Sequence, residues 1–363
     1  MPKLVAVEAV GDDSFVPALL AAWERGDALL PVDPRLPRPA REALLASLRV
    51  GDDVEPGDAL VVPTSGTTGE PKGVVLTHDA VRASALATSR RLNVDPHADQ
   101  WLACLPLAHV GGLSVVTRSL VTGTPLSLLP GFDAEAVDRS SATLVSLVAT
   151  ALRRVDPSRW RVIVLGGSVP PDALPENVVT TYGMTETGSG VVYDGVPLDG
   201  VDVRVDDQIW LRGPTLLRCY RTATGEHDPK DSDGWFPTGD AGRFESDGRL
   251  HVDGRIGLLI ITGGEKVWPE AVEAALRSDP AVADVAVAGE PDHEWGQRVV
   301  AFVVPVTPAQ PPDLDRLRGT VKESLPAYCA PRELVLVDDL PRTALGKIKR
   351  PVGRPRPARE AGS

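Results

Sequence analysis

The chain has 363 residues, 42% of them hydrophobic and 24% charged, and a formal net charge of −12 at pH 7. This length can bury a large core and favours two domains, and the acidic balance argues against nucleic acid or an anionic membrane as the main partner. No apolar run approaches the roughly 20 residues of a membrane span, and the N-terminus lacks the features of a signal peptide. Three scattered cysteines form no metal or disulfide pattern, so we expect a cytoplasmic protein without membrane insertion.

The first part of the chain predicts little regular structure before a short buried strand. Residues 1–58 read as a weak opening segment with a helix at 41–48 and proline-rich connections such as 31–34. Residues 59–62 (ALVV) form an apolar run typical of a buried strand.

A loop with the chemistry of phosphate binding follows that strand. Residues 64–73 (TSGTTGEPKG) contain three glycines, four hydroxyl side chains and one lysine. Glycine lets backbone N–H groups approach phosphate oxygens, and hydroxyls and an ammonium group add donors and charge. A flexible linker is the plain alternative, but a linker needs neither the lysine nor the preceding strand. The loop is not a GxxxxGK[ST] P-loop, because Pro71 and Gly73 break that pattern.

The middle of the chain alternates strands and helices. Helices are predicted at residues 79–92, capped by Thr77 or Asp79, and from about residue 113 to 121. Strands are predicted at 101–105, 126–129, 143–148 and 162–165, with helical segments between them. This alternation favours an α/β layer with a largely parallel sheet.

Further motifs lie at the ends of these elements and beyond them. They are PLAHVGGL (106–113), LGGS (165–168), TYGMTET (181–187), GWFPTGD (234–240), GRIG (254–257), TGGEKV (262–267) and PRTALGKIKR (341–350). Short strands between residues 199 and 253 predict a β-rich subdomain. Strands at 258–261, 283–288 and 299–304 with helices at 269–277 and 313–325 predict a compact α+β domain.

Taken together, the motifs resemble those of the acyl-adenylate-forming (AMP-binding) superfamily, which includes acyl-CoA ligases, luciferases and peptide-synthetase adenylation domains. The resemblance covers about residues 60–350 and implies an α/β fold with a large N-terminal adenylate-forming domain of layered sheets and helices (1–256). It also implies a small, mobile C-terminal α+β domain (257–350). Lys and Arg without acidic residues between them, from Arg342 to Arg359, separately predict a basic, proline-rich and disordered tail (351–363). Two departures stand out: the front end is shorter than in full-length members, and Gly257 replaces the usual Asp or Lys at the pivot between the domains.

The resemblance also implies a role for individual residues, with ATP, Mg²⁺ and CoA as the reaction partners. It assigns catalysis to Lys347 and His109, Mg²⁺ to Glu186 and Thr67, and the acyl substrate to His109, Thr187, Gly188 and Ser189. The nucleotide and CoA sites comprise Thr64, Ser65, Gly66, Thr67, Thr68, Gly69, Lys72, Gly166, Gly167, Ser168, Tyr182, Gly183, Thr185, Asp240, Arg255, Gly263 and Gly264. The chemistry agrees with these roles, since an aromatic face covers a purine, and carboxylate oxygens suit Mg²⁺ and ribose hydroxyls.

The expected activity is therefore activation of a carboxylic acid as an acyl-adenylate, with release of pyrophosphate, and transfer of the acyl group to CoA. The short front end, together with residues 105–109 and 191–200, resembles the actinobacterial type of o-succinylbenzoate–CoA ligase, an enzyme of menaquinone biosynthesis. Other aryl- or acyl-CoA ligases, a stand-alone adenylation enzyme and an inactive nucleotide-binding regulator are alternatives. The oligomeric state, with a homodimer as one option, is left open by the sequence.

Overall fold

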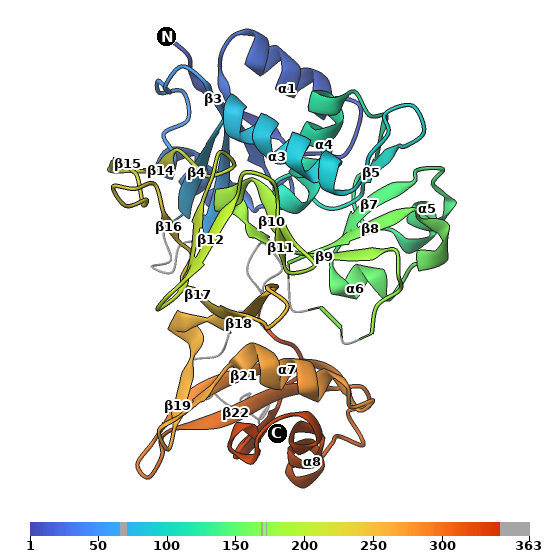
Figure 1. The fold of residues 1–363 in the computed structure, drawn as a ribbon, viewed down its shortest axis with the longest axis vertical. Coiled ribbons are helices and arrows are strands. Elements are labelled where there is room, and N and C mark those ends of the chain that lie inside the picture. Colours follow the sequence, from blue (N-terminus) through green and yellow to red (C-terminus); the bar gives the residue numbers. More distant parts are fainter. Residues whose placement is uncertain (66–70, 168–169, 172, 342–363) are drawn as a thin grey trace, which may run out of the picture. The chain divides into compact units, whose positions relative to one another are not determined.

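The computed structural model describes residues 1–65, 71–167, 170–171 and 173–341 (Figure 1). The chain divides into two compact units. The first comprises Met1–Thr238 with Phe244–His251, and the second comprises Gly239–Arg243 with the chain from Val252 onward. The predicted boundary at residue 257 stays a prediction, and the predicted tail lies outside the described residues.

The first unit opens with a six-stranded sheet that runs in the order β1-β2-β3-β4-β14-β15. Its strands are β1 (Leu4–Glu8), β2 (Ala28–Val32), β3 (Asp58–Ser65), β4 (Pro71–Thr77), β14 (Cys219–Thr222) and β15 (Gly225–His227). The first three strands are parallel and the others antiparallel. Helices α1 (Phe15–Glu24) and α2 (Arg38–Ser47) connect the first strands.

The opening segment is more regular than predicted. Pro31 lies in β2, where all five residues are buried, and not in a connection. The register of β2 with β3 is confined to Leu29 and Leu60, so the missing N–H of Pro31 does not interrupt that ladder. Burial between two neighbouring strands outweighs the low strand propensity of proline.

A seven-stranded sheet forms the other half of this unit, in the order β11-β10-β9-β8-β7-β5-β6. Its strands are β5 (Trp101–Ala103), β6 (Leu126–Leu128), β7 (Leu144–Leu147), β8 (Val162–Leu165), β9 (Val178–Met184), β10 (Ser189–Tyr193) and β11 (Val196–Pro197). The strands from β6 to β9 are parallel, and β10 and β11 are antiparallel additions, which confirms the predicted, largely parallel sheet. Helices α5 (Ala134–Arg139) and α6 (Ala149–Leu152) belong to this half.

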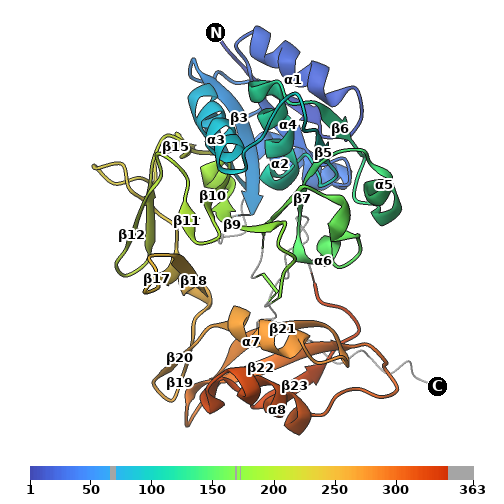
Figure 2. The same cartoon turned by 45° about the vertical axis from the view of Figure 1, so that its right-hand side comes forward.

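Two helices link the two sheets. Helix α3 (His78–Arg91) contacts β3, β4 and β10, and α4 (Val110–Thr122) contacts β5, β7 and β10 and packs on α3 (Figures 1 and 2). The predicted cap is confirmed, because the Thr77 hydroxyl accepts the N–H of Ala80 at 3.1 Å. Side chains of α4 are therefore enclosed on both sides.

The predicted β-rich region is built from short antiparallel strands. They are β12 (Asp202–Val205), β13 (Ile209–Arg212) and β16 (Phe236–Pro237), and the hairpin of β17 (Asp240–Phe244) and β18 (Leu250–Arg255).

The second unit has a five-stranded sheet with two helices. Its elements are β19 (Ile260–Thr262), β20 (Glu265–Val267), α7 (Pro269–Arg277), β21 (Val282–Asp292), β22 (Gly296–Pro305), α8 (Leu314–Ser324) and β23 (Glu333–Leu336). Val285 and Val287 share a core with the helices, whereas Ala286 and Phe302 pack with Leu340. This alternation is the period of two expected of a strand covered on both faces. In the described ranges, no helix has the length and apolar character needed to cross a bilayer.

Candidate active site

The two ends of the phosphate-loop sequence belong to the paired strands β3 and β4. Thr64 and Ser65 at the end of β3 pair with Lys72 and Pro71 at the start of β4. Gly66, Thr67, Thr68 and Gly69 lie outside the described residues, so the structure places the two stems of the loop. A Cβ at Gly73 would lie 2.4 Å from Val61 Cγ1, so this glycine is needed for the close approach of the stems.

A second predicted group lies at the carboxyl edge of the parallel sheet. Gly166 and Gly167 follow β8, Tyr182 and Gly183 end β9, and Ser168 lies outside the described residues. Because β8 and β9 are parallel and adjacent, these segments meet at one edge of the sheet. A Cβ at Gly166 would lie 2.8 Å from Thr181 Oγ1. The two motifs, well separated in sequence, thus lie side by side.

The motif around Glu186 forms a tight turn between β9 and β10. Thr185, Glu186 and Thr187 form a 3₁₀ turn that ends at Gly188, where φ is +68°. The Thr187 hydroxyl accepts the N–H of Met184 at 2.9 Å and is fully buried, so it stabilises the turn. A Cβ at Gly183 would lie 2.2 Å from the carbonyl oxygen of Ser189, which makes glycine necessary for the β9–β10 pairing.

Glu186 is held by β14 and its preceding loop. Its carboxylate oxygen Oε1 accepts the hydroxyl of Tyr220 at 2.8 Å, and its carbonyl oxygen accepts the N–H of Leu217 at 2.7 Å. The Lys72 ammonium lies 4.3 Å from the centre of the Tyr220 ring. Three groups from three segments therefore meet here.

The surroundings of Glu186 fit Mg²⁺. The described part of the chain contains no cluster of three or more His, Cys, Asp or Glu side chains that could hold a metal ion. Mg²⁺ is typically bound by one or two carboxylates, water and substrate phosphates, and does not need a cage of protein ligands. A single carboxylate, linked through Tyr220 to the lysine of the phosphate-loop sequence, meets that requirement.

Arg118, in the middle of α4, is a functional candidate that the sequence analysis did not single out. Its side chain is 2% exposed, and burial lowers the pKa of its guanidinium. It donates to the hydroxyls of Ser189 and, at 3.4 Å, Ser146, and lies 5.3 Å from the centre of the Trp101 ring. Its Nε is buried and has no hydrogen-bond partner. The signal was available, because Arg118 is the one charged residue in the sequence of α4.

The neighbours of Arg118 are unusual for a buried charged residue. Buried charges in proteins are normally paired with an opposite charge. Among the described residues no carboxylate forms an ion pair with Arg118, and its partners are neutral hydroxyls. The predicted substrate residue Ser189 links it further to Ser114, to whose hydroxyl it donates at 3.4 Å. This arrangement can recognise an anionic group.

His109 lies at the start of the same helix, as its N-cap residue. A hydrogen bond from Arg35 and, to a lesser degree, the charge of His109 lower the pKa of Asp33, so the histidine is within electrostatic reach of this buried carboxylate. The second of the two glycines after His109 has a packing role. A Cβ at Gly112 would lie 2.3 Å from the carbonyl oxygen of Leu105, so this glycine lets α4 approach the backbone.

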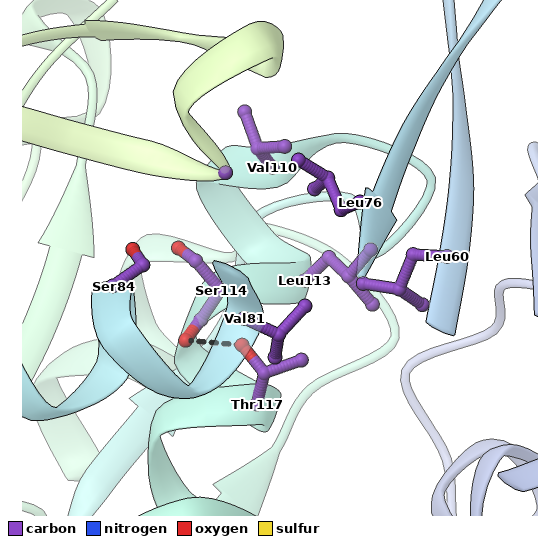
Figure 3. A pocket seen from close by; sticks show the side chains of 9 residues that line it. Leu60, Leu76, Val81, Ser84, Val110, Leu113, Ser114 and Thr117 are labelled. Carbon is purple, nitrogen blue, oxygen red and sulfur yellow. Dashed lines mark hydrogen bonds between the residues drawn. The ribbon is translucent and has the colours of Figure 1, made fainter. Parts of the chain in front are cut away.

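A small cavity of about 10 Å³ lies between β3, β4, α3, α4 and the turn at Gly188 (Figure 3). Leu60, Leu76, Val81, Val110 and Leu113 make it apolar, and Ser84, Ser114 and Thr117 add hydroxyl groups. It has room for about one water molecule.

The second unit brings together two predicted nucleotide residues. Asp240 is 6% exposed, and its carboxylate forms an ion pair with Arg255 at 2.8 Å. Gly239 has φ +72°, and a Cβ there would lie 3.3 Å from the Arg255 guanidinium. The motifs at 234–240 and 254–257 thus meet through the β17–β18 hairpin.

Two glycines of the predicted nucleotide and CoA sites also lie in this unit. Gly263 and Gly264 have positive φ values of +59° and +85° at the turn between β19 and β20. Gly263 packs against Trp295, since a Cβ would lie 2.6 Å from its ring. Lys347 lies outside the described residues.

Two family models match the chain. One, described as AMP-binding enzyme, matches residues 50–221, and one, described as AMP-binding enzyme C-terminal domain, matches residues 271–347. The chain therefore belongs to the AMP-binding enzyme family, which confirms the resemblance of its motifs.

Individual relatives indicate which AMP-binding enzymes the chain is similar to. The chain is 43% identical over 337 residues to "Probable 2-succinylbenzoate--CoA ligase" of Mycobacterium tuberculosis, covering 85% of this chain and 87% of the relative. It is 37% identical over 332 residues to 2-succinylbenzoate--CoA ligase of Bacillus licheniformis, covering 80% and 69%. The structure of o-succinylbenzoate coenzyme A synthetase from Bacillus subtilis, in complex with ATP and magnesium ion, matches with a TM-score of 0.86 and 27% identity over 96% of this chain and 88% of that chain.

Proposed function

We propose that this protein is an ATP-dependent, AMP-forming acyl-CoA ligase that activates o-succinylbenzoate for menaquinone biosynthesis. The acid reacts with ATP to give an acyl-adenylate and pyrophosphate, and the thiol of CoA then displaces AMP. The family membership and the names of its relatives support the reaction.

The observation that carries the choice of acid is the buried guanidinium of Arg118. o-Succinylbenzoate has two carboxylates, of which one reacts and the other stays ionised. A buried cation with an unpaired Nε and neutral hydroxyl neighbours offers that second carboxylate a charged hydrogen-bond donor. Ser189 and Ser114 complete the polar surface, and Thr187 and Gly188 hold the turn that presents Ser189. An acid without a second anionic group would leave Arg118 unpaired.

The remaining residues bring two anions together at the reacting atoms. The carboxylate attacks the α-phosphorus of ATP while the bond to pyrophosphate breaks, so negative charge must be stabilised around the phosphates. This task is assigned to Lys72, to the stems of the phosphate loop and to Thr185. The strands β3 and β4 carry the stems and Lys72, and the Glu186 turn carries Thr185. Tyr182 is assigned to adenine, Asp240 with Arg255 to the ribose side, His109 to the reacting carboxylate and Lys347 to the α-phosphate.

Glu186, with Thr67, is assigned to Mg²⁺. When bound, the ion neutralises phosphate charge. Glu186 contributes an oriented carboxylate, since both its carbonyl and its side chain are fixed by hydrogen bonds. The Gly263-Gly264 loop is assigned to the thioester-forming step with CoA.

The test is the acid dependence of each half-reaction. Purified protein is incubated with ATP, Mg²⁺ and o-succinylbenzoate, and pyrophosphate and AMP are measured before and after CoA is added. We expect pyrophosphate release that requires o-succinylbenzoate, and consumption of CoA in equal amount to AMP. Benzoate and malonate serve as comparison acids.

The alternatives give different results. Turnover with a comparison acid but not with o-succinylbenzoate identifies another acyl-CoA ligase. Adenylate formation with no transfer to CoA identifies a stand-alone adenylation enzyme. ATP binding without pyrophosphate release from any acid identifies a nucleotide-binding regulator.

The proposal includes a cytoplasmic location, which agrees with nucleotide and CoA substrates and with three unpaired, buried cysteines. A homodimer is also part of the proposal, and sedimentation equilibrium of the purified protein tests it.

A further inference from the structure

Tyr220 connects two charged residues that are remote from it in sequence. In the antiparallel pairing of β14 with β4, Tyr220 lies opposite Val74. Lys72 is two residues from Val74 and therefore lies on the same face, diagonal to Tyr220, within reach of a long side chain. The register of two strands accounts for the 4.3 Å between the Lys72 ammonium and the centre of the Tyr220 ring.

The hydroxyl end of the same side chain reaches Glu186. Tyr220 donates to Glu186 Oε1 at 2.8 Å, and the N–H of Leu217, three residues before Tyr220, donates to the Glu186 carbonyl at 2.7 Å. The loop leading into β14 therefore fixes the backbone of Glu186, and β14 itself fixes its carboxylate. A carboxylate held at one oxygen keeps the other for a cation.

We infer that Tyr220 is a positioning residue that sets the geometry of both Glu186 and Lys72 for the metal–nucleotide complex. This inference rests on the proposed function, because it assumes that Glu186 faces Mg²⁺ and Lys72 faces phosphate. The hydroxyl of Tyr220 orients the carboxylate of Glu186, and the face of its ring holds the ammonium group of Lys72. The two parts of one side chain thus have separable effects.

The first test separates the hydroxyl from the ring. Mn²⁺ replaces Mg²⁺, and no acid substrate is present. Binding of Mn²⁺ to the protein together with a non-hydrolysable ATP analogue is followed by the electron paramagnetic resonance signal of free Mn²⁺. Tyr220→Phe should weaken Mn²⁺ binding about 10-fold, the usual effect of removing a hydrogen bond to a metal ligand. Binding of the analogue in the presence of EDTA should not change. Unchanged Mn²⁺ affinity in this variant overturns the inference for the hydroxyl.

The ring is tested with Tyr220→Leu. This variant should lose Mn²⁺ affinity like Tyr220→Phe, and should also bind the analogue about threefold more weakly in EDTA, as expected for loss of a cation–π contact at a partly exposed site. Equal metal-free affinity in the Leu and Phe variants overturns the inference for the ring.

Tyr193→Phe is the matched control. Its hydroxyl also makes a buried hydrogen bond, at 3.0 Å to Thr88, but contacts neither Glu186 nor Lys72. If loss of any buried phenol bond loosened the protein, this control would weaken Mn²⁺ binding as well, and we expect that it does not. Equal weakening in the control and in Tyr220→Phe overturns the inference.

A double-mutant cycle tests whether Tyr220 acts through Glu186. In a Glu186→Ala background, Tyr220→Phe should change the remaining Mn²⁺ affinity less than twofold. A 10-fold effect that persists there overturns the inference, because Tyr220 would then act by another route. Failure of the proposed function is distinguishable, since it appears as absence of metal–nucleotide binding or of acid-dependent pyrophosphate release in the unmodified protein.

Discussion

At the scale of single residues, the buried charge of Arg118 has opposite effects on folding stability and on the proposed binding of the acid. An ion without an opposite charge in the protein interior is expensive to desolvate, and replacing it with an apolar side chain of similar length is often neutral or stabilising. The same charge becomes favourable once a carboxylate arrives. Recognition of the acid would then explain an arginine in a helix that has no other charged residue.

We predict that Arg118→Met raises the KM for o-succinylbenzoate about 100-fold, because a charged hydrogen bond to substrate is worth about 1.5–3 kcal/mol. The KM for ATP should change less than twofold, and the free energy of unfolding should not fall. Steady-state kinetics and chemical denaturation measure these quantities.

Arg118→Lys and a second acid provide the controls. Lysine keeps the charge but loses the planar fork of donors, so its KM should lie between those of the unmodified protein and Arg118→Met. Benzoate, which lacks the second carboxylate, is tested as a competitive inhibitor, and its inhibition constant should differ little between the Met variant and the unmodified protein. A rise in that constant similar to the rise in KM for o-succinylbenzoate would contradict the assignment.

At the scale of elements, the start of α4 depends on one of two adjacent glycines. We predict that Gly112→Ala destabilises the protein by about 1–3 kcal/mol, the usual range for overpacking, because its Cβ would lie 2.3 Å from the Leu105 carbonyl oxygen. Gly111→Ala is the matched control, since its nearest contact is 3.5 Å and the site is exposed. The measurement is the denaturant midpoint of each variant, which should be lower for Gly112→Ala than for Gly111→Ala. Equal midpoints would mean that the backbone contact is not important.

A second element-scale interaction ties the end of α7 to α8. Burial alone would raise the pKa of Asp279, but hydrogen bonds from Arg316 (both at 2.7 Å) and the N–H of Ala281 outweigh it and lower that pKa. The carboxylate therefore stabilises the folded state at pH values above its unfolded pKa. That stabilisation is lost as the pH falls through the lower, folded pKa.

We predict that Asp279→Asn lowers the free energy of unfolding by about 1.5–3 kcal/mol at pH 7, the range for hydrogen bonds to charged groups. The difference from the unmodified protein should shrink as the pH falls below about 4, where the carboxylate of the unfolded chain becomes protonated, and should be lost below the lower, folded pKa. Urea denaturation at pH 7 and pH 3 measures it. Asp338→Asn, at an exposed site, is the control, and a difference independent of pH would argue against the ion pair.

Much of this element structure was predictable because it depends on local patterns. The helices at 78–91 and 269–277 and the strands of the parallel sheet follow from apolar periodicity, caps and Pro269. The sequence did not predict β1, α1 and β2. In β2, the strand at Pro31 forms through burial between neighbouring strands and not through strand propensity. Motif residues such as Asp240 and Arg255 could be named, but their ion pair could not.

Interactions between remote segments set the limit of that prediction. The contact of Tyr220 with Lys72 depends on the register of β14 against β4, and sequence spacing does not contain that register. The role of Gly183 depends likewise on the bulged pairing of β9 with β10. Arg118 differs, because the one charged residue of a helix is visible in the sequence.

At the scale of the whole molecule, we propose that the mobile C-terminal domain implied by the motifs takes a different arrangement in each half-reaction. A connection that serves both must absorb a large change in backbone angles over few residues. Gly257 suits this requirement. It lies in the exposed 3₁₀ turn Ile256–Leu258, and a Cβ built there has no neighbour within 4 Å.

We predict that Gly257→Pro yields a folded protein in which one half-reaction is severely impaired relative to the other. Proline fixes its own φ near −65° and disfavours the helical conformation of the residue before it, here Ile256 at the start of the turn. Gly257→Ala is the matched control, because its methyl group meets open space and its φ lies outside the left-handed region. Pyrophosphate release and thioester formation from supplied acyl-adenylate are measured for both variants. The ratio of the two rates should change at least about 10-fold in the proline variant, the equivalent of about 1.4 kcal/mol, and should stay constant in the alanine variant. If both rates of the proline variant match those of the unmodified protein, the pivot lies at another residue.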